Sequence, residues 1–178
     1  MGAAKGPLYI THFRRRREGT TNYPQRLALL KRGGARLVVR KTNRGVIAQF
    51  VTFDLKGDRT LSSCTTLQLH ELGFPGKRNT PSAYLVGLKA GMLVKSKGVT
   101  DFTLDIGRSS ATKGSLVFAA LQGALDAGLT APHGEQIMPS ADRVSGKHLS
   151  AEVQKAFTTA KQKIISEVGP EKPAKGGA

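Results

Sequence analysis

Positively charged side chains gather at two places near the beginning of the chain. Four consecutive arginines occupy residues 14–17, and residues 40–44 read RKTNR. Cationic groups at this density repel one another, and a polyanion that neutralises them makes such clusters tolerable. The chemistry that these residue types offer is therefore binding of phosphate groups.

The excess of positive charge is strongest in the first 50 residues, which hold 12 basic residues and one acidic residue. For a compact protein, the polyanions that match such a charge are nucleic acid or an anionic membrane surface. No stretch approaches the roughly 20 consecutive apolar residues of a spanning helix, and no secretory signal is visible. We expect a protein of the cytoplasm or nucleus that is not inserted in a membrane.

Catalysis and metal binding have little support. Cys64 and four scattered histidines show no metal-ligand spacing, so we predict a buried or neutral thiol, no metal and no cofactor. Lys113 precedes Gly114 in the loop GRSSATKGS, which is the wrong order for a nucleotide-hydrolysing P-loop. Asp54 and Asp105 would suit a two-metal nuclease if the fold brought them together, although no Glu or His supports them.

The loop around residues 107–115 remains a candidate for anion binding. It follows a predicted buried strand and precedes a predicted helix, which is where ligands usually bind in α/β sheets. The side chains available there for anion contact are those of Arg108, Ser109, Thr112 and Lys113.

The elements that must position these groups begin with an arm and a short helix. Residues 1–17 show no period, which predicts an extended arm that orders only against a partner. The stretch TNYPQRLALLKRGG predicts a helix capped by Thr21 or Asn22, opened by Pro24 and stopped by glycine, with a basic polar face.

Three strands should follow this helix. ARLVVRKT and VIAQFVTFD, joined by the turn NRG, predict a tight hairpin, and RTLSSCT predicts a third antiparallel strand. Alternation along the first strand sends Arg36, Val38 and Arg40 to one face and Leu37 and Val39 to the other.

The second half predicts helix, strand, loop and helix over residues 80–128, which implies a right-handed crossover and a mixed sheet covered on both faces. Gly87 and Gly91 in the first of these helices indicate close backbone packing. Residues 146–168 predict an amphipathic helix, and residues 169–178 predict a disordered tail. We therefore divide the chain into an arm (1–17), an α/β domain (18–145), this helix and the tail.

Charge runs are usually just solvated faces, but here the arm, the first helix and the hairpin carry the same sign within 50 residues. The cluster at 40–44 also lies on a rigid two-stranded ribbon that can enter a groove or follow a phosphate backbone. This coincidence favours nucleic-acid binding, without deciding between RNA and DNA.

Several segments together resemble one known family. RRRREGTTNYPQRLALLKRGGARLVVRKTNRGVIAQFVT, PSAYLVGLKAG, LDIGRSSATKGSLVFAALQGALDAGL and PHGEQIMPSADRVSGKHL are similar, in this order, to archaeal L-eighteen ribosomal proteins, whose longer eukaryotic relatives are called L-five. The resemblance covers residues 8–150. It implies a ribonuclease-H-like three-layer α/β/α sandwich with a mixed sheet and no catalysis.

The resemblance also implies partners and contacts. A member of this family binds 5S ribosomal RNA and, with a neighbouring protein of the family that bacterial nomenclature calls L-five, attaches it to the 23S-type RNA in the central protuberance of the large subunit in the cytoplasm. The residues that we expect to contact RNA are Arg14, Arg15, Arg16, Arg17, Tyr23, Arg26, Lys31, Arg32, Arg40, Lys41, Thr42, Asn43, Arg44, Gln49, Arg108 and Lys113.

One position departs from the family pattern. Many members carry a histidine where this chain has Gly45, which puts a stacking or hydrogen-bonding contact at the hairpin turn in doubt. Glycine there would instead let the backbone approach RNA closely. A basic RNA- or DNA-binding module outside the ribosome, and less favourably a metal-dependent nuclease, are the alternatives to the ribosomal role.

Overall fold

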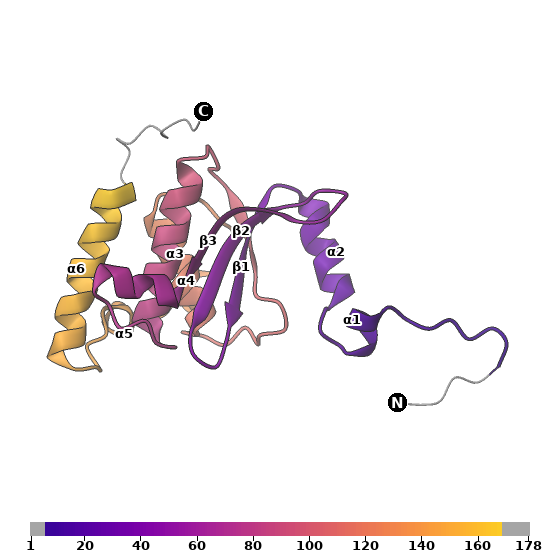
Figure 1. Ribbon diagram of the computed structural model, residues 1–178, viewed down its shortest axis with the longest axis horizontal. Helices are drawn as coiled ribbons and strands as arrows, with labels where there is room; N and C mark the ends of the chain where they lie inside the picture. The colour runs from indigo at the N-terminus through magenta and orange to yellow at the C-terminus, as the bar shows by residue number, and fades with distance from the viewer. Residues whose placement is uncertain (1–5, 169–178) are drawn as a thin grey trace.

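The computed structural model describes residues 6–168 (Figure 1). In chain order, the helices and strands are α1 (Arg14–Arg17), α2 (Tyr23–Arg32), β1 (Ala35–Lys41), β2 (Val46–Thr52), β3 (Arg59–Thr65), the 3-10 helix η1 (Thr66–Leu72), α3 (Thr80–Lys95), β4 (Phe102–Asp105), α4 (Leu116–Asp126), the 3-10 helix η2 (Glu135–Ile137), α5 (Ala141–Ser145) and α6 (Ala151–Val168).

The four strands form one mixed sheet in the order β3-β2-β1-β4. β1, β2 and β3 pair antiparallel, as the sequence predicts, and β4 lies parallel to β1 with Asp105 opposite Val38. The α/β class and the mixed sheet are therefore confirmed, while the ribonuclease-H-like topology stays a prediction.

One face of the sheet forms the core together with α3 and α4. Leu37 and Val39 of β1 are fully buried on this face, and Phe50 of β2 meets Phe102 of β4 edge to face. Cys64 also lies inside, and burial raises the pKa of its thiol to about 11. The predicted buried, neutral thiol is confirmed.

α3 and α4 pack at unusually short range because glycines line their contact. A Cβ atom at Gly87 would overlap the backbone carbonyl of Ala120, and one at Gly123 would overlap the backbone of Tyr84. At Gly91 the nearest atom to such a Cβ would be that of Ala127, at 2.9 Å. The close backbone packing predicted from Gly87 and Gly91 is confirmed.

The last helix starts later than the sequence predicts. Gly146 adopts a left-handed conformation (φ 77°) that ends α5, so α6 begins at Ala151 rather than at residue 146. Phe157, Ala160 and Ile164 on the apolar face of this amphipathic helix are buried, and Phe157 packs on Tyr84 of α3 with ring centroids 5.7 Å apart. α6 thus docks on the domain; the predicted tail at 169–178 lies outside the described residues.

α2 lies on the side of the sheet away from α3 and α4, which agrees with a three-layer arrangement (Figure 1). Of the two predicted caps, Asn22 is the one used: its side-chain oxygen accepts a hydrogen bond from the Gln25 N–H. No residue of α2 is buried, so this helix covers the sheet without adding to the buried core.

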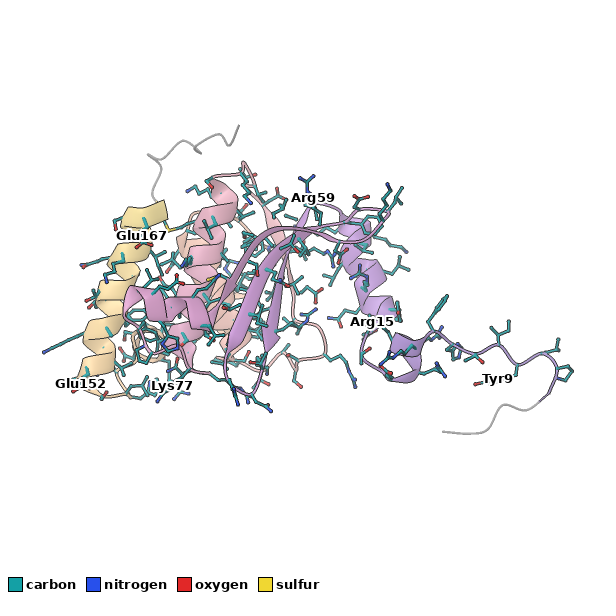
Figure 2. The ribbon with its side chains drawn as sticks, in the orientation of Figure 1. Tyr9, Arg15, Arg59, Lys77, Glu152 and Glu167 are labelled. Atoms are coloured by element: carbon teal, nitrogen blue, oxygen red, sulfur yellow. The ribbon has the colours of Figure 1, made fainter. Side chains whose placement is uncertain are left out.

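The arm is not extended throughout. Residues 14–17 form one helical turn, in which the Glu18 N–H donates to the Arg14 carbonyl and the two side chains form an ion pair of 2.7 Å. The pair lies at i and i+4, a spacing that supports a helical turn. Residues 6–13 run away from the domain, with Tyr9 far from the sheet (Figures 1 and 2).

Candidate nucleic-acid interface

A polar cleft of about 360 Å³ opens between α2, the end of β1 and the loop after β4. Figure 2 shows Arg15 near the beginning of α2, at one end of this region. The lining residues are Arg15, Thr20, Thr21, Asn22, Gln25, Arg26, Leu29, Arg40, Lys41, Asp105, Ile106, Gly107, Arg108 and Ser109.

The cleft unites predicted RNA contacts that are far apart in the sequence. Arg15 comes from the arm, Arg26 from α2, Arg40 and Lys41 from β1, and Arg108 from the loop after β4. The strand-to-helix loop and the basic N-terminal block therefore belong to one surface, as expected if both face the same ligand.

An ion-pair chain, formed by Arg26, Asp58, Arg36, Asp105 and Arg40, ties α2 to the sheet. Arg26 of α2 lies 2.9 Å from one oxygen of Asp58, and Arg36 of β1 lies 2.8 Å from the other. Arg36 is 1% exposed, yet within residues 6–168 its guanidinium has no hydrogen bond of regular geometry. Its contacts with the carboxylates are therefore mainly electrostatic.

Asp105 continues the ion-pair chain. Its carboxylate lies 3.0 Å from Arg40 and 3.5 Å from Arg36, and it accepts a hydrogen bond of 2.8 Å from the Gly107 N–H. Gly107 has a φ of 61°, and a Cβ there would come within 2.7 Å of the Arg40 guanidinium. Asp105 thus shapes the turn and holds Arg40 in place.

The same contacts oppose the nuclease alternative. Two arginines already neutralise the Asp105 carboxylate. Asp54 follows β2, which runs antiparallel to β1, whereas β4 is parallel to β1, so the carboxyl ends of β2 and β4 point to opposite ends of the sheet. The fold therefore does not pair the two aspartates at one edge.

Two of the predicted RNA contacts that line the cleft form ion pairs within the protein. Arg26 is bound to Asp58, and Arg40 donates to the carbonyls of Val39 and Asp105 as well as to the Asp105 carboxylate. By contrast, neither Lys41 nor Arg108 forms an ion pair within residues 6–168, and both are exposed. Lys41 and Arg108 are thus free to meet a ligand at the cleft, as is Arg15, whose Nε donates only to the Thr21 hydroxyl among the described side chains.

The hairpin turn is fixed from within. The Thr42 hydroxyl accepts from the Gly45 N–H at 3.0 Å and donates to the Gly45 carbonyl at 3.1 Å, which leaves Asn43 and Arg44 exposed at the tip. A Cβ at Gly45 would overlap the hydroxyl of Thr66. Glycine here lets the turn pack closely against η1. Because Gly45 is buried, the expectation that its backbone approaches RNA is wrong.

The other predicted contacts lie outside the cleft. Tyr23, Lys31 and Arg32 are exposed on α2, and Lys113 is exposed further along the loop. Gln49 lies on the outer face of the sheet, where its side-chain amide donates to the Ser63 hydroxyl.

Sequence reasoning missed several groups that shape this surface. Asn22, Gln25 and Leu29 line the cleft, and Arg36 and Asp58 support it from below. One signal was available for Arg36: it alternates with Arg40 on a strand whose opposite face is apolar, and a buried arginine needs a carboxylate. Nothing in the sequence indicated which carboxylate.

The arm adds exposed apolar side chains to its positive charge. Leu8, Ile10 and Phe13 are 91%, 82% and 85% exposed, which is costly in water without a partner. Within residues 6–168, no three His, Cys, Asp or Glu side chains come together as metal ligands. None of the helices described is long and apolar enough to cross a membrane.

The chain is similar to known ribosomal proteins over most of its length. The model of a family described as ribosomal large subunit proteins 60S L5 and 50S L18 matches residues 8–101. A large ribosomal subunit protein uL18 from Methanoregula boonei is 49% identical over 154 residues, covering 86% of this chain and 88% of that protein. A uL18 from Korarchaeum cryptofilum is 47% identical over 153 residues, covering 85% of this chain and 78% of that protein.

Proposed function

The chain belongs to the family of ribosomal large subunit proteins 60S L5 and 50S L18, and from this premise we propose that it binds 5S ribosomal RNA and attaches it to 23S-type RNA in the central protuberance. Its general role in the ribosome follows from membership of the family alone. It is a structural, non-enzymatic constituent of the large ribosomal subunit and acts in the cytoplasm.

The observation that carries the proposal is the convergence of basic groups around one cleft. The arm, α2, the hairpin and the loop after β4 are separate in the sequence, yet all contribute to the same side of the sheet. Phosphates along an RNA backbone neutralise such a surface and release counterions, which supplies affinity. The exposed Asn43 and Arg44 at the rigid hairpin tip supply groups that can distinguish one RNA shape from another.

Attachment to a second RNA and to a neighbouring protein of the bacterial L-five family needs further surface. The arm supports this part of the proposal, because residues 6–13 run away from the domain and expose Leu8, Ile10 and Phe13. An apolar and aromatic arm next to four arginines can fill a gap between RNA and protein while its charges contact phosphates.

The proposal is tested by competition binding. The full chain, treated with nuclease to remove copurifying RNA, is bound to labelled 5S RNA in the presence of transfer RNA or duplex DNA, across salt concentrations, with and without Mg²⁺. We expect tight 5S binding that survives competition at physiological salt and leaves the RNA intact. Equal binding to every polyanion would indicate a general basic module, and Mg²⁺-dependent cleavage would indicate a nuclease.

A further inference from the structure

The cleft between α2 and the loop after β4 has the properties of a site for a single small ligand. Its volume of about 360 Å³ lies within the range of ligand pockets, and is much more than one phosphate group needs. Three polar contacts fix residues of its lining: Arg26 to Asp58, Arg40 to Asp105, and Arg15 Nε to the Thr21 hydroxyl at 2.9 Å.

Its charges suit an anion that carries a larger group. Asp105 is the carboxylate in the lining, and its charge is offset by Arg36 and Arg40. Lys41 and Arg108 stand exposed without ion-pair partners in the described part of the chain, and Arg15, also without an ion pair there, donates to the neutral Thr21 hydroxyl. A phosphate at the mouth would therefore meet up to three cations.

The remaining lining is not what a phosphate requires. Leu29 and Ile106 offer apolar surface, and Asn22, Gln25 and Ser109 offer hydrogen-bonding groups. Asn22 uses its side-chain oxygen to cap α2, so its amide N–H groups remain as donors. Apolar walls with a few polar groups are what a heterocyclic base needs when it leaves its stack and is read along its edge.

We propose that this cleft takes up one unstacked nucleotide of the bound RNA, with its base against Leu29 and Ile106 and its phosphate near Lys41 and Arg108. This inference rests on the proposed RNA-binding function and deepens it: most basic residues supply affinity, whereas the cleft supplies recognition of an unpaired position. Single-stranded loops and bulges are the parts of folded RNA that offer such a nucleotide.

The first test fills the cleft. Leu29→Trp adds bulk inside it, and because α2 buries no residue, the fold should tolerate the change. We expect binding to 5S RNA to weaken about tenfold, on the scale of one misread position, with an unchanged salt slope because no cation is lost. Leu27→Trp is the matched control: Leu27 is on the same helix, 55% exposed and outside the cleft, and should leave affinity unchanged.

The second test observes the nucleotide itself. 2-Aminopurine, which brightens when it leaves a base stack, is placed in turn at each unpaired position of 5S RNA and mixed with the full-length protein. The chain has no tryptophan, and the cleft lining has no aromatic ring to quench the probe. We expect one position to brighten with the wild-type and Leu27→Trp proteins, and to brighten less with Leu29→Ala, which removes the apolar wall without adding a ring that could quench the probe.

The outcomes separate the two proposals. Selective 5S binding by the wild-type protein with no brightened position, or with Leu29→Trp binding as tightly as wild type, would overturn the nucleotide site and leave the RNA-binding function standing. A wild-type protein that shows no preference for 5S RNA would overturn both.

Discussion

The two faces of the sheet are covered by opposite means. On one side, α3 buries 12 of its 16 residues and meets α4 across glycines. On the other side, α2 buries none of its residues, and the ion pair between Arg26 and Asp58 links this helix to the loop that precedes β3. Apolar burial supplies folding free energy, whereas an exposed basic surface is useful only against a partner. We therefore propose that folding free energy comes mainly from one side of the sheet and RNA binding from the other.

The largest effect should follow from Gly87→Ala. The added methyl group overlaps the backbone of Ala120, which forces α3 and α4 apart and should cost about 3 kcal/mol of the free energy of unfolding. Denaturant unfolding measures this loss, and RNA affinity per folded molecule should not change. Gly134→Ala is the control, since nothing lies within 4 Å and its φ of −96° suits alanine. Equal stabilities for both variants would contradict the close contact.

For the arm we expect the reverse: lower RNA affinity with unchanged stability. Replacing Arg14, Arg15, Arg16 and Arg17 by glutamine should weaken RNA binding roughly a hundredfold and lower the salt slope by roughly three units, because each phosphate contact contributes about 0.7 to 0.9. All four side chains are exposed, so unfolding should stay within about 0.5 kcal/mol of wild type. An unchanged salt slope would remove the arm from the interface.

Arg36 lies between the carboxylates of Asp58 and Asp105, so it links the ion pair of α2 to that of Arg40. Arg36→Met removes the middle of the ion-pair chain, although Asp58 and Asp105 each keep one arginine. We expect a loss of about 2 kcal/mol in stability. RNA affinity should also fall several-fold, because the ion pairs that position α2 and Arg40 lose their common partner. This effect is indirect, since a side chain that is 1% exposed cannot contact RNA. Lower stability with unaltered RNA affinity would show that the chain of ion pairs serves the fold alone.

The smallest effect concerns selectivity. Asn43→Ala combined with Arg44→Ala should reduce the preference for 5S RNA over unrelated RNA by several-fold, since these groups lie at a tip held by Thr42 and Gly45. Competition titrations measure the ratio of affinities, with Lys56→Ala as a control for loss of one exposed charge elsewhere. An equal loss for every RNA would mean that the tip acts only through charge.

Local patterns predicted much of this fold because they reflect local physics. Alternation along β1 placed Leu37 and Val39 in the core, and the NRG turn placed the hairpin, since both depend on neighbouring residues. Other local features are not visible in hydrophobic periodicity. The side chain of Asn79 caps α3, and Gly146 separates α5 from α6 through a left-handed backbone conformation.

The sequence predicted the charge of the candidate site but not the shape of its cleft. The basic residues around the cleft were found because their sign and density are visible in the sequence. The engagement of Arg26 and Arg40 was not visible, because it depends on Asp58 and Asp105 arriving from 32 and 65 residues away. Neutral lining groups such as Gln25 and Leu29 carry no signal of their own until α2 is placed against the sheet.

The central claim is tested most directly by hydrogen exchange of the full chain, free and bound to 5S RNA. We expect binding to slow exchange in residues 14–32, 41–45 and 106–113, and to leave α4 and α6 unchanged relative to the free protein. Protection concentrated in α5 and α6, with α2 and the hairpin exchanging as before, would contradict the account and move the RNA interface to the other side of the molecule.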